Sequence, residues 1–230
     1  MLLSEAVVSA CSGVALYSMY RLLARYLEPP KGVDARELAC RSCSALHAAV
    51  TGSGAVLTIV GAAAPSLGPL CMSVSIGYFM HDTIVVLSMG TEQNYAPILA
   101  HHVLSGCSMA AMLMPESRRF LWYANLLQWT ECTIPIQFAC WLMEIYAVDA
   151  ARPRLYAAGR WLMAAAWVSM RLALMGAFFH FAWVDRANLN TTAKAVGCVI
   201  GPFLAAFNVG GFFKVVLPGM PWLGEKGKRH

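Results

Sequence analysis

The sequence predicts an all-α protein that crosses a membrane several times, and its composition and hydropathy both support this. Of the 230 residues, 59% are hydrophobic and only 13% are charged, whereas about a quarter of the residues in a soluble domain are charged. The mean hydropathy is +0.58. Apolar stretches of about 20 residues, the length of a helix that crosses a bilayer, recur along the whole chain.

Seven stretches have the length and composition of a membrane-spanning helix, namely residues 2–20, 37–61, 69–89, 95–114, 119–148, 155–184 and 194–217. The first runs past the length of a signal-peptide core, so we expect it to be retained as a span. The second is rich in Ser, Gly and Ala, which favour close contacts between helices. Pro135 cannot donate a backbone hydrogen bond, so we expect a kink near Glu131.

The connections between these stretches are short, which indicates a single domain. We expect an N-terminal helix with a basic connection at 1–35, a core domain at 36–217 and a basic tail at 218–230. The eight cysteines are scattered and most lie in apolar stretches, so we expect packing residues and no disulfide framework. Cys40 and Cys43 have no second pair at a suitable spacing, so we expect no metal site.

The distribution of basic residues predicts an orientation. On the predicted topology, one side holds twelve of the 17 Lys and Arg residues: Arg21, Arg25, Lys31, Arg36, Arg41, Arg152, Arg154, Arg160, Lys214, Lys226, Lys228 and Arg229. The positive-inside rule then puts the C-terminus in the cytosol. The Lys226-x-Lys228-x-x tail resembles a dilysine signal, which indicates the endoplasmic reticulum. The alternative is an ordinary basic tail in another organelle membrane. No basic run with interleaved aromatics occurs before the tail, so we expect no nucleic-acid partner.

The histidine pair His101-His102 is the principal candidate site. Ionisable groups inside a membrane indicate function by default, and two adjacent imidazoles have little packing value there. Asp82 lies about seven residues before the end of its span and His101 about six after the start of the next. At 1.5 Å per residue both lie roughly 10 Å below the same surface. A contact between Asp82 and the histidine pair is therefore expected.

Further polar residues are expected to face the interior of the bundle. Asn125, Gln128 and Glu131 recur at a spacing of three residues, which puts them on one helical face. A buried charge needs a partner, so we expect Arg171 to pair with Glu131 or Asp82. Asn208 follows in the last span. Asn125, Gln128 and Asn208 are equally consistent with hydrogen bonding between helices and no further role.

These residues resemble the TLC-domain membrane proteins, whose best-known members are ceramide synthases. Five pieces match in order over residues 36–217: Arg41-x-x-Ser44-x-x-His47-Ala48; Gly77-Tyr78 with Asp82; His101-His102; Asn125 with Thr130-Glu131-x-Thr133-x-Pro135; and Arg171 followed by Asn208-x-x-Gly211-Phe212-Phe213-Lys214. The synthases' extended signature does not follow His102, so the closer likeness is to the shorter TLC-domain proteins. The resemblance implies six core helices around a lipid pocket beside the histidines, with the first span outside.

The resemblance and the polar residues together imply an acyltransferase that acts on a lipid or a long-chain amine. His101 or His102 would be the base or nucleophile, oriented by Asp82, and Arg171 or Asn208 would stabilise negative charge. Glu131, Asn125 and Gln128 would join them in contact with lipid. No resident cofactor is expected, and acyl-CoA or a phospholipid would be the donor.

Two alternatives remain open. One is a non-enzymatic protein that binds or traffics membrane lipids, or serves as an accessory subunit beside other membrane proteins. The lesser alternative is a haem-binding electron carrier, for which His47, His81, His101 and His180 are the available ligands.

Overall fold

The computed structural model describes residues 2–89 and 96–220, and this part of the chain is almost entirely helical. The α-helices are α1 (Leu3–Tyr26), α2 (Ala35–Ile59), α3 (Leu67–Ser88), α4 (Ala96–Met112), α5 (Leu121–Gln128), α6 (Thr133–Ile145), α7 (Val148–Ala151), α8 (Pro153–Ala166), α9 (Leu174–Val184), α10 (Thr191–Ala195) and α11 (Gly201–Gly211). The predicted all-α class is confirmed.

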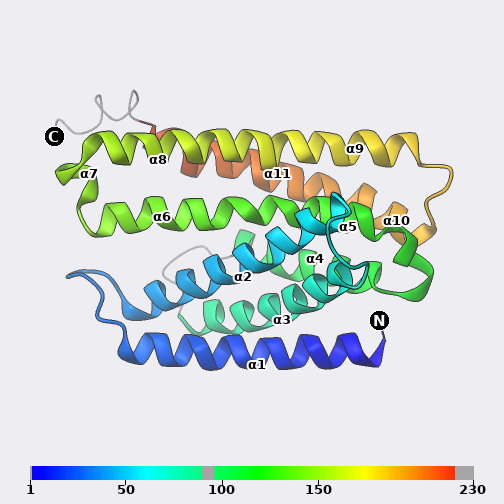
Figure 1. The fold of residues 1–230 in the computed structure, drawn as a ribbon, viewed down its shortest axis with the longest axis horizontal. Coiled ribbons are helices and arrows are strands. Elements are labelled where there is room, and N and C mark those ends of the chain that lie inside the picture. The colour runs from blue at the N-terminus through cyan, green and yellow to red at the C-terminus, as the bar shows by residue number, and fades with distance from the viewer. Residues whose placement is uncertain (1, 90–95, 221–230) are drawn as a thin grey trace.

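Tighter and wider turns join several of these helices. The 3-10 turns are Pro115–Phe120, Trp129–Cys132 and Leu217–Gly219. The π-helical turns are Trp167–Ala173, Val196–Ile200 and Phe212–Val216. Through them α8 continues into α9, and α10 continues into α11. Figure 1 shows α8 and α9 as one long rod.

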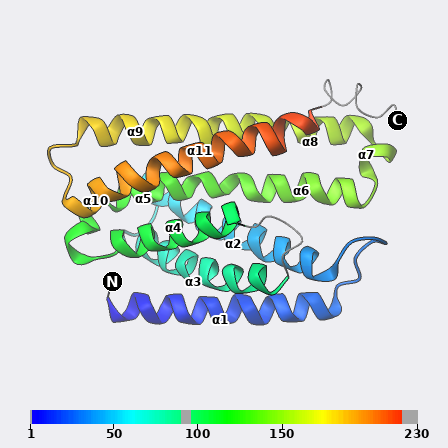
Figure 2. The same ribbon diagram turned by 180° about the vertical axis from the view of Figure 1, so that it is seen from behind.

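Helix α1 lies at one edge of the bundle and α8–α9 at the opposite edge, with α2, α3 and α6 between them (Figure 1). Helix α1 packs against α2 and α3. Only Glu5, Ser9 and Tyr20 of α1 are buried. Seen from behind, α4 and α11 cover the other face (Figure 2). The first span therefore lies at the edge of the bundle, as expected.

Five of the described helical segments are individually long and apolar enough to cross a membrane: 3–26, 35–59, 67–88, 153–184 and 191–219. The segments 96–112 and 115–145 meet the same test only as a pair, and they are bent by 103° at the break. The described part of α4 has 17 residues. The two predicted spans in this region are therefore found as α4 and a longer segment that turns sharply away from it.

The expected break near Glu131 is present. The helix narrows to a 3-10 turn at Trp129–Cys132 and becomes α-helical again at Thr133. Pro135 has no N–H to donate to the carbonyl of Glu131, four residues earlier, so the regular hydrogen-bond ladder cannot continue there. The turn separates α5 from α6 and directs Glu131 differently from Asn125.

Helices α1, α2 and α3 approach closely where their residues are small. A Cβ at Gly52 would lie 2.7 Å from Cys132 Sγ, so α2 contacts the 3-10 turn directly. A Cβ at Gly77 of α3 would collide with the backbone oxygen of Ser9 in α1. The prediction that small residues of the second span form close helix contacts is confirmed at Gly52.

The two ends of the bundle differ in charge. The α1–α2 connection, α7 and the end of α11 lie at one end, and the start of α1 and the α9–α10 connection lie at the other (Figure 1). Nine of the twelve basic residues assigned to one side belong to the described part, and their helices place them toward the first end. At the opposite end, Glu5 pairs with Arg118. The dilysine-like tail lies outside the described residues.

Candidate functional site

The two adjacent histidines face different parts of the bundle. His101 lines a cavity between α4, α5, α9 and α11, and His102 faces α3, with Nε2 3.4 Å from Asp82 Oδ2. Their ring centroids are 5.7 Å apart. Consecutive helical residues are about 100° apart around the axis, so one pair can serve two neighbouring regions.

His102 and Asp82 form a contact that is buried inside the bundle. They are 6% and 4% exposed. The thiol of Cys40 donates to the other oxygen of Asp82, with Sγ 3.1 Å from Oδ1. The predicted contact between Asp82 and the histidine pair is present, and it involves His102. Neither residue lines the cavity.

The hollow that contains the cavity holds about 810 Å³ of space between atoms, open solvent included, and most of this space is too narrow to be a free cavity. Its polar lining consists mainly of His101, Gln128, Glu131, Arg171 and Asn208, together with small hydroxyl side chains. These five come from α4, from the α5 segment and its 3-10 turn, from the π turn after α8, and from α11. Residues far apart in sequence thus meet at one end of the cavity.

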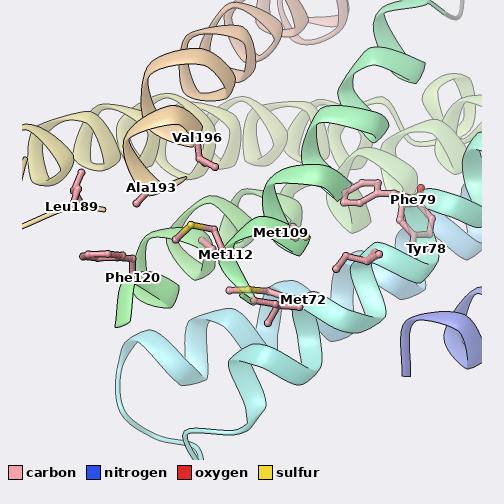
Figure 3. Close-up of a cluster of buried hydrophobic side chains, with 12 residues drawn as sticks. Met72, Tyr78, Phe79, Met109, Met112, Phe120, Leu189, Ala193 and Val196 are labelled. Carbon is pink, nitrogen blue, oxygen red and sulfur yellow. The ribbon is translucent and has the colours of Figure 1, made fainter. Parts of the chain in front are cut away.

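The rest of the cavity wall is apolar and extends toward the end of the bundle where α10 lies. Met109 and Met112 of α4 contribute to it, as do Leu189, Ala193 and Val196. These five residues belong to one buried cluster (Figure 3). A cavity with one polar end and one apolar end matches the shape and polarity of an amphiphile.

His101 has few contacts of its own. Its ring stacks on Phe207 of α11, with centroids 4.7 Å apart and planes 3° apart. Nδ1 lies 3.4 Å from Ser105 Oγ. Nε2 has no partner among the described residues. One ring nitrogen is therefore available to a ligand in the cavity.

Arg171 differs from the prediction. It makes no ion pair with Glu131 or Asp82 within the described ranges. Instead Nε donates to Thr133 Oγ1 at 2.6 Å and Nη1 donates to Asn208 Oδ1 at 2.9 Å. Its guanidinium also lies 4.6 Å from the ring centroid of Trp167. Neutral acceptors bond two donors of the buried cation, and Glu131 acts on it as a nearby charge without a direct ion pair.

The three polar residues expected on one face of the fifth span are separated by the 3-10 turn. Gln128 Nε2 donates to Ser75 Oγ at 2.7 Å while the residue lines the cavity, and Glu131 also lines it. Asn125 does not: its Nδ2 donates to the carbonyl of Leu121, and its side chain packs on Gly68. Asn125 therefore does not line this cavity, because it faces α3, and its contact with lipid stays a prediction.

A hydrogen-bonded network behind the cavity was not predicted. His47 Nε2 lies 2.9 Å from Ser75 Oγ, and its ring stacks on Tyr78 with centroids 3.9 Å apart. The hydroxyl of Tyr78 lies 2.7 Å from that of Ser44. In the sequence, the only indication of this network was that His47, Ser44 and Tyr78 belong to the motif pieces that match the family pattern.

The π turns coincide with the walls of the cavity. The first contains Arg171, and the second contains Val196. Such widened turns are frequent at functional sites, because they redirect side chains that a regular helix would bury elsewhere.

All eight cysteines are free, as expected. The haem alternative stays a prediction.

Comparison with known proteins identifies the family. A family model described as the TLC domain matches residues 41–220, which is well over half of the chain. No curated protein and no solved structure shows significant similarity. The apolar helices and the family match together make this an integral membrane protein in contact with lipid. The chain belongs to the TLC-domain family.

Proposed function

We propose that the chain is an acyltransferase that holds an acyl chain in its cavity and transfers the acyl group at His101. One observation carries the proposal: His101 lines the polar end of a cavity whose other end is apolar. A predominantly apolar lining of this kind is suited to a hydrocarbon chain. An imidazole at its polar end is suited to act as base or nucleophile toward the acyl carbonyl.

The neighbouring residues have different proposed roles in the reaction. As nucleophile, His101 Nε2 attacks the acyl carbon, the bond from that carbon to the CoA sulfur or the phospholipid oxygen breaks with release of CoA or lysolipid, and the acceptor amine or alcohol then takes the acyl group from the imidazole. As base, Nε2 instead removes the proton from the amine or alcohol that attacks the acyl carbon directly, with the same leaving group. Arg171 and Asn208, already joined to each other, stabilise negative charge that develops on the carbonyl oxygen. His102 and Asp82 are positioning residues, because their buried contact fixes the rotation of α4. The donor is acyl-CoA or a phospholipid, and no resident cofactor is required.

The proposed setting is the endoplasmic reticulum membrane with the C-terminus in the cytosol. This assignment relies on the excess of basic residues at one end of the bundle and on the dilysine-like tail. Protease protection of tagged termini in microsomes tests the orientation.

Purified protein in detergent, given a labelled acyl donor and either a long-chain amine or a lysolipid, tests the activity. We expect His101→Ala to lower the rate at least about a hundredfold, since a positioned acid–base group contributes that much. His180→Ala is the matched control, because His180 is exposed on α9 and does not line the cavity. Wild-type activity in a His101→Ala His102→Ala double variant would refute the role of the pair.

A second function, lipid binding without turnover, is favoured by one observation. Two donors of Arg171, Nε and Nη1, are already bonded to Thr133 and Asn208, as in a site that only holds its ligand. Native mass spectrometry distinguishes the two functions. A retained lipid that is never converted, whatever acceptor is supplied, supports binding alone.

A further inference from the structure

A second hollow, which we term the basic cleft, lies at the end of the bundle opposite α10. It has a volume of about 740 Å³, including open space, and is lined by Arg41, Gln137, Trp141, Glu144, Arg160, Lys214, Val215, Pro218 and Gly219. These residues come from the beginning of α2, the end of α6, the middle of α8 and the turns after α11. Figure 2 shows α6, α8 and α11 converging at this end.

The cleft carries an excess of positive charge. Its lining includes three cations and one carboxylate, Glu144. Arg41 lies over Trp141, with its guanidinium carbon 4.6 Å from the ring centroid. It also binds Glu37 at 2.8 Å. Stacking on the indole fixes one wall of the cleft while leaving the positive charge in place.

Arg160 is built into the floor. It is 6% exposed, and its Nη2 donates to the carbonyls of Val215 at 2.9 Å and Val216 at 3.0 Å. Glu144 Oε1 is 3.5 Å from Nη1. Nε is buried and has no partner among the described residues. The guanidinium lies directly on Gly219, where any Cβ would collide with it.

Lys214 is the exposed cation of the cleft. It lies in the π turn Phe212–Val216. Its ammonium has no hydrogen bond or ion pair within the described part of the chain. An exposed ammonium and guanidinium groups that line the same cleft are charged donors of the kind that binds a phosphate ester.

The basic cleft and the cavity lie along the same helices. Asn208 at the polar end of the cavity precedes Lys214 by six residues, which is about 9 Å of helix. Arg160 precedes Arg171 by eleven residues, which is about 16 Å. The cleft therefore lies beyond the polar end of the cavity, away from its apolar end. This order along the helices is the one needed for a single amphiphile with a phosphate beyond its acyl group to reach both.

We infer that the basic cleft binds the phosphate group of an amphiphile whose acyl chain occupies the cavity. The phosphate belongs either to a CoA thioester or to a lipid headgroup. The link to the acyl chain rests on the proposed function, whereas binding of phosphate in the cleft does not.

Titration of the protein, purified in phosphate-free maltoside detergent, separates the two sources. One arm uses CoA without an acyl chain, and the other compares lysophosphatidic acid with the monoacylglycerol of equal chain length. We expect at least one phosphate-bearing probe to bind, with an affinity that falls as ionic strength rises. Binding of CoA would show that the phosphate comes from a CoA thioester. Preference for lysophosphatidic acid over monoacylglycerol would show that it comes from a lipid headgroup.

Variants of the cleft test whether this binding occurs there. Lys214→Gln and Arg41→Gln should each lower the affinity for the phosphate-bearing probe about tenfold, as expected for loss of a charge-assisted contact. Lys194→Gln is the matched control, since Lys194 is an exposed lysine on α10 at the opposite end. Unchanged affinity in both cleft variants, an equal loss in Lys194→Gln, or no binding of either probe would overturn the inference. Phosphate binding without acyl transfer would overturn the proposed function alone.

Discussion

The two sides of the histidine pair differ in packing, and not in how completely their polar groups are bonded, since His102 Nδ1 and both ring nitrogens of His81 also lack a partner among the described residues. Toward α1, α2 and α3, helices meet through glycines, and the Asp82 carboxylate contacts both His102 and Cys40. Toward α9 and α11, the neighbouring His101 lines a cavity and leaves one ring nitrogen without a partner among the described residues. The packed side supplies rigidity, and the cavity side supplies space and an available imidazole.

The largest expected effect distinguishes the two histidines by stability. His102→Ala leaves the Asp82 carboxylate buried without its imidazole, and breaking such a contact costs about 3 kcal/mol. His101→Ala removes mainly the stacking on Phe207, which is worth about 1 kcal/mol. The free energy of unfolding in detergent, measured by denaturant titration, should therefore fall much further in His102→Ala.

A double-mutant cycle tests the cause of that loss. If the unpaired carboxylate is responsible, His102→Ala should cost clearly less in an Asp82→Asn background, because the charge is then absent. An equal cost in both backgrounds would mean that the imidazole contributes through packing alone, and the contrast between the two sides would lose its electrostatic part.

The helical class and the break before Pro135 were predictable, because they depend on local hydropathy and backbone chemistry, whereas the edge position of the first helix followed only from the resemblance to the TLC-domain family. A proline removes one specific hydrogen bond, wherever the helix lies. The 103° bend between α4 and the following segment was not predictable. Its two halves are each apolar, and hydropathy does not report the direction in which a helix points.

The membership of the site was predictable in part. A polar residue inside an apolar span can be recognised from the sequence alone, without knowledge of how the helices pack. In this way the sequence identified His101, Glu131, Arg171 and Asn208, which line the cavity. The pairing among them was not, because it depends on the rotation of each helix. The π turn at Trp167–Ala173 directs Arg171 to neutral acceptors, and no periodicity in the sequence reveals a π turn.

A smaller effect is expected from crowding the packed side. A Cβ at Gly77 would collide with the Ser9 carbonyl and the Ser12 hydroxyl of α1. Gly77→Ala must therefore push α1 away from α3, and such overpacking costs about 2 kcal/mol. We expect a lower unfolding temperature in detergent and faster proteolysis of the α1–α2 connection. Wild-type stability in this variant would show that the contact between α1 and α3 adjusts freely.

The smallest expected effect is an increase in stability, and it concerns a residue on the cavity side. Gly176 lies in α9, is exposed, and has nothing within 4 Å of the position of a Cβ. Gly176→Ala adds no collision and removes the backbone freedom of glycine, so the helix should gain about 0.5–1 kcal/mol. The same substitution thus destabilises the protein at Gly77 and stabilises it at Gly176. Unfolding temperatures of the two variants, measured side by side, check this difference. A loss of stability at Gly176 would mean that α9 packs more tightly than its surroundings indicate, and that the looseness of this side is confined to the cavity itself.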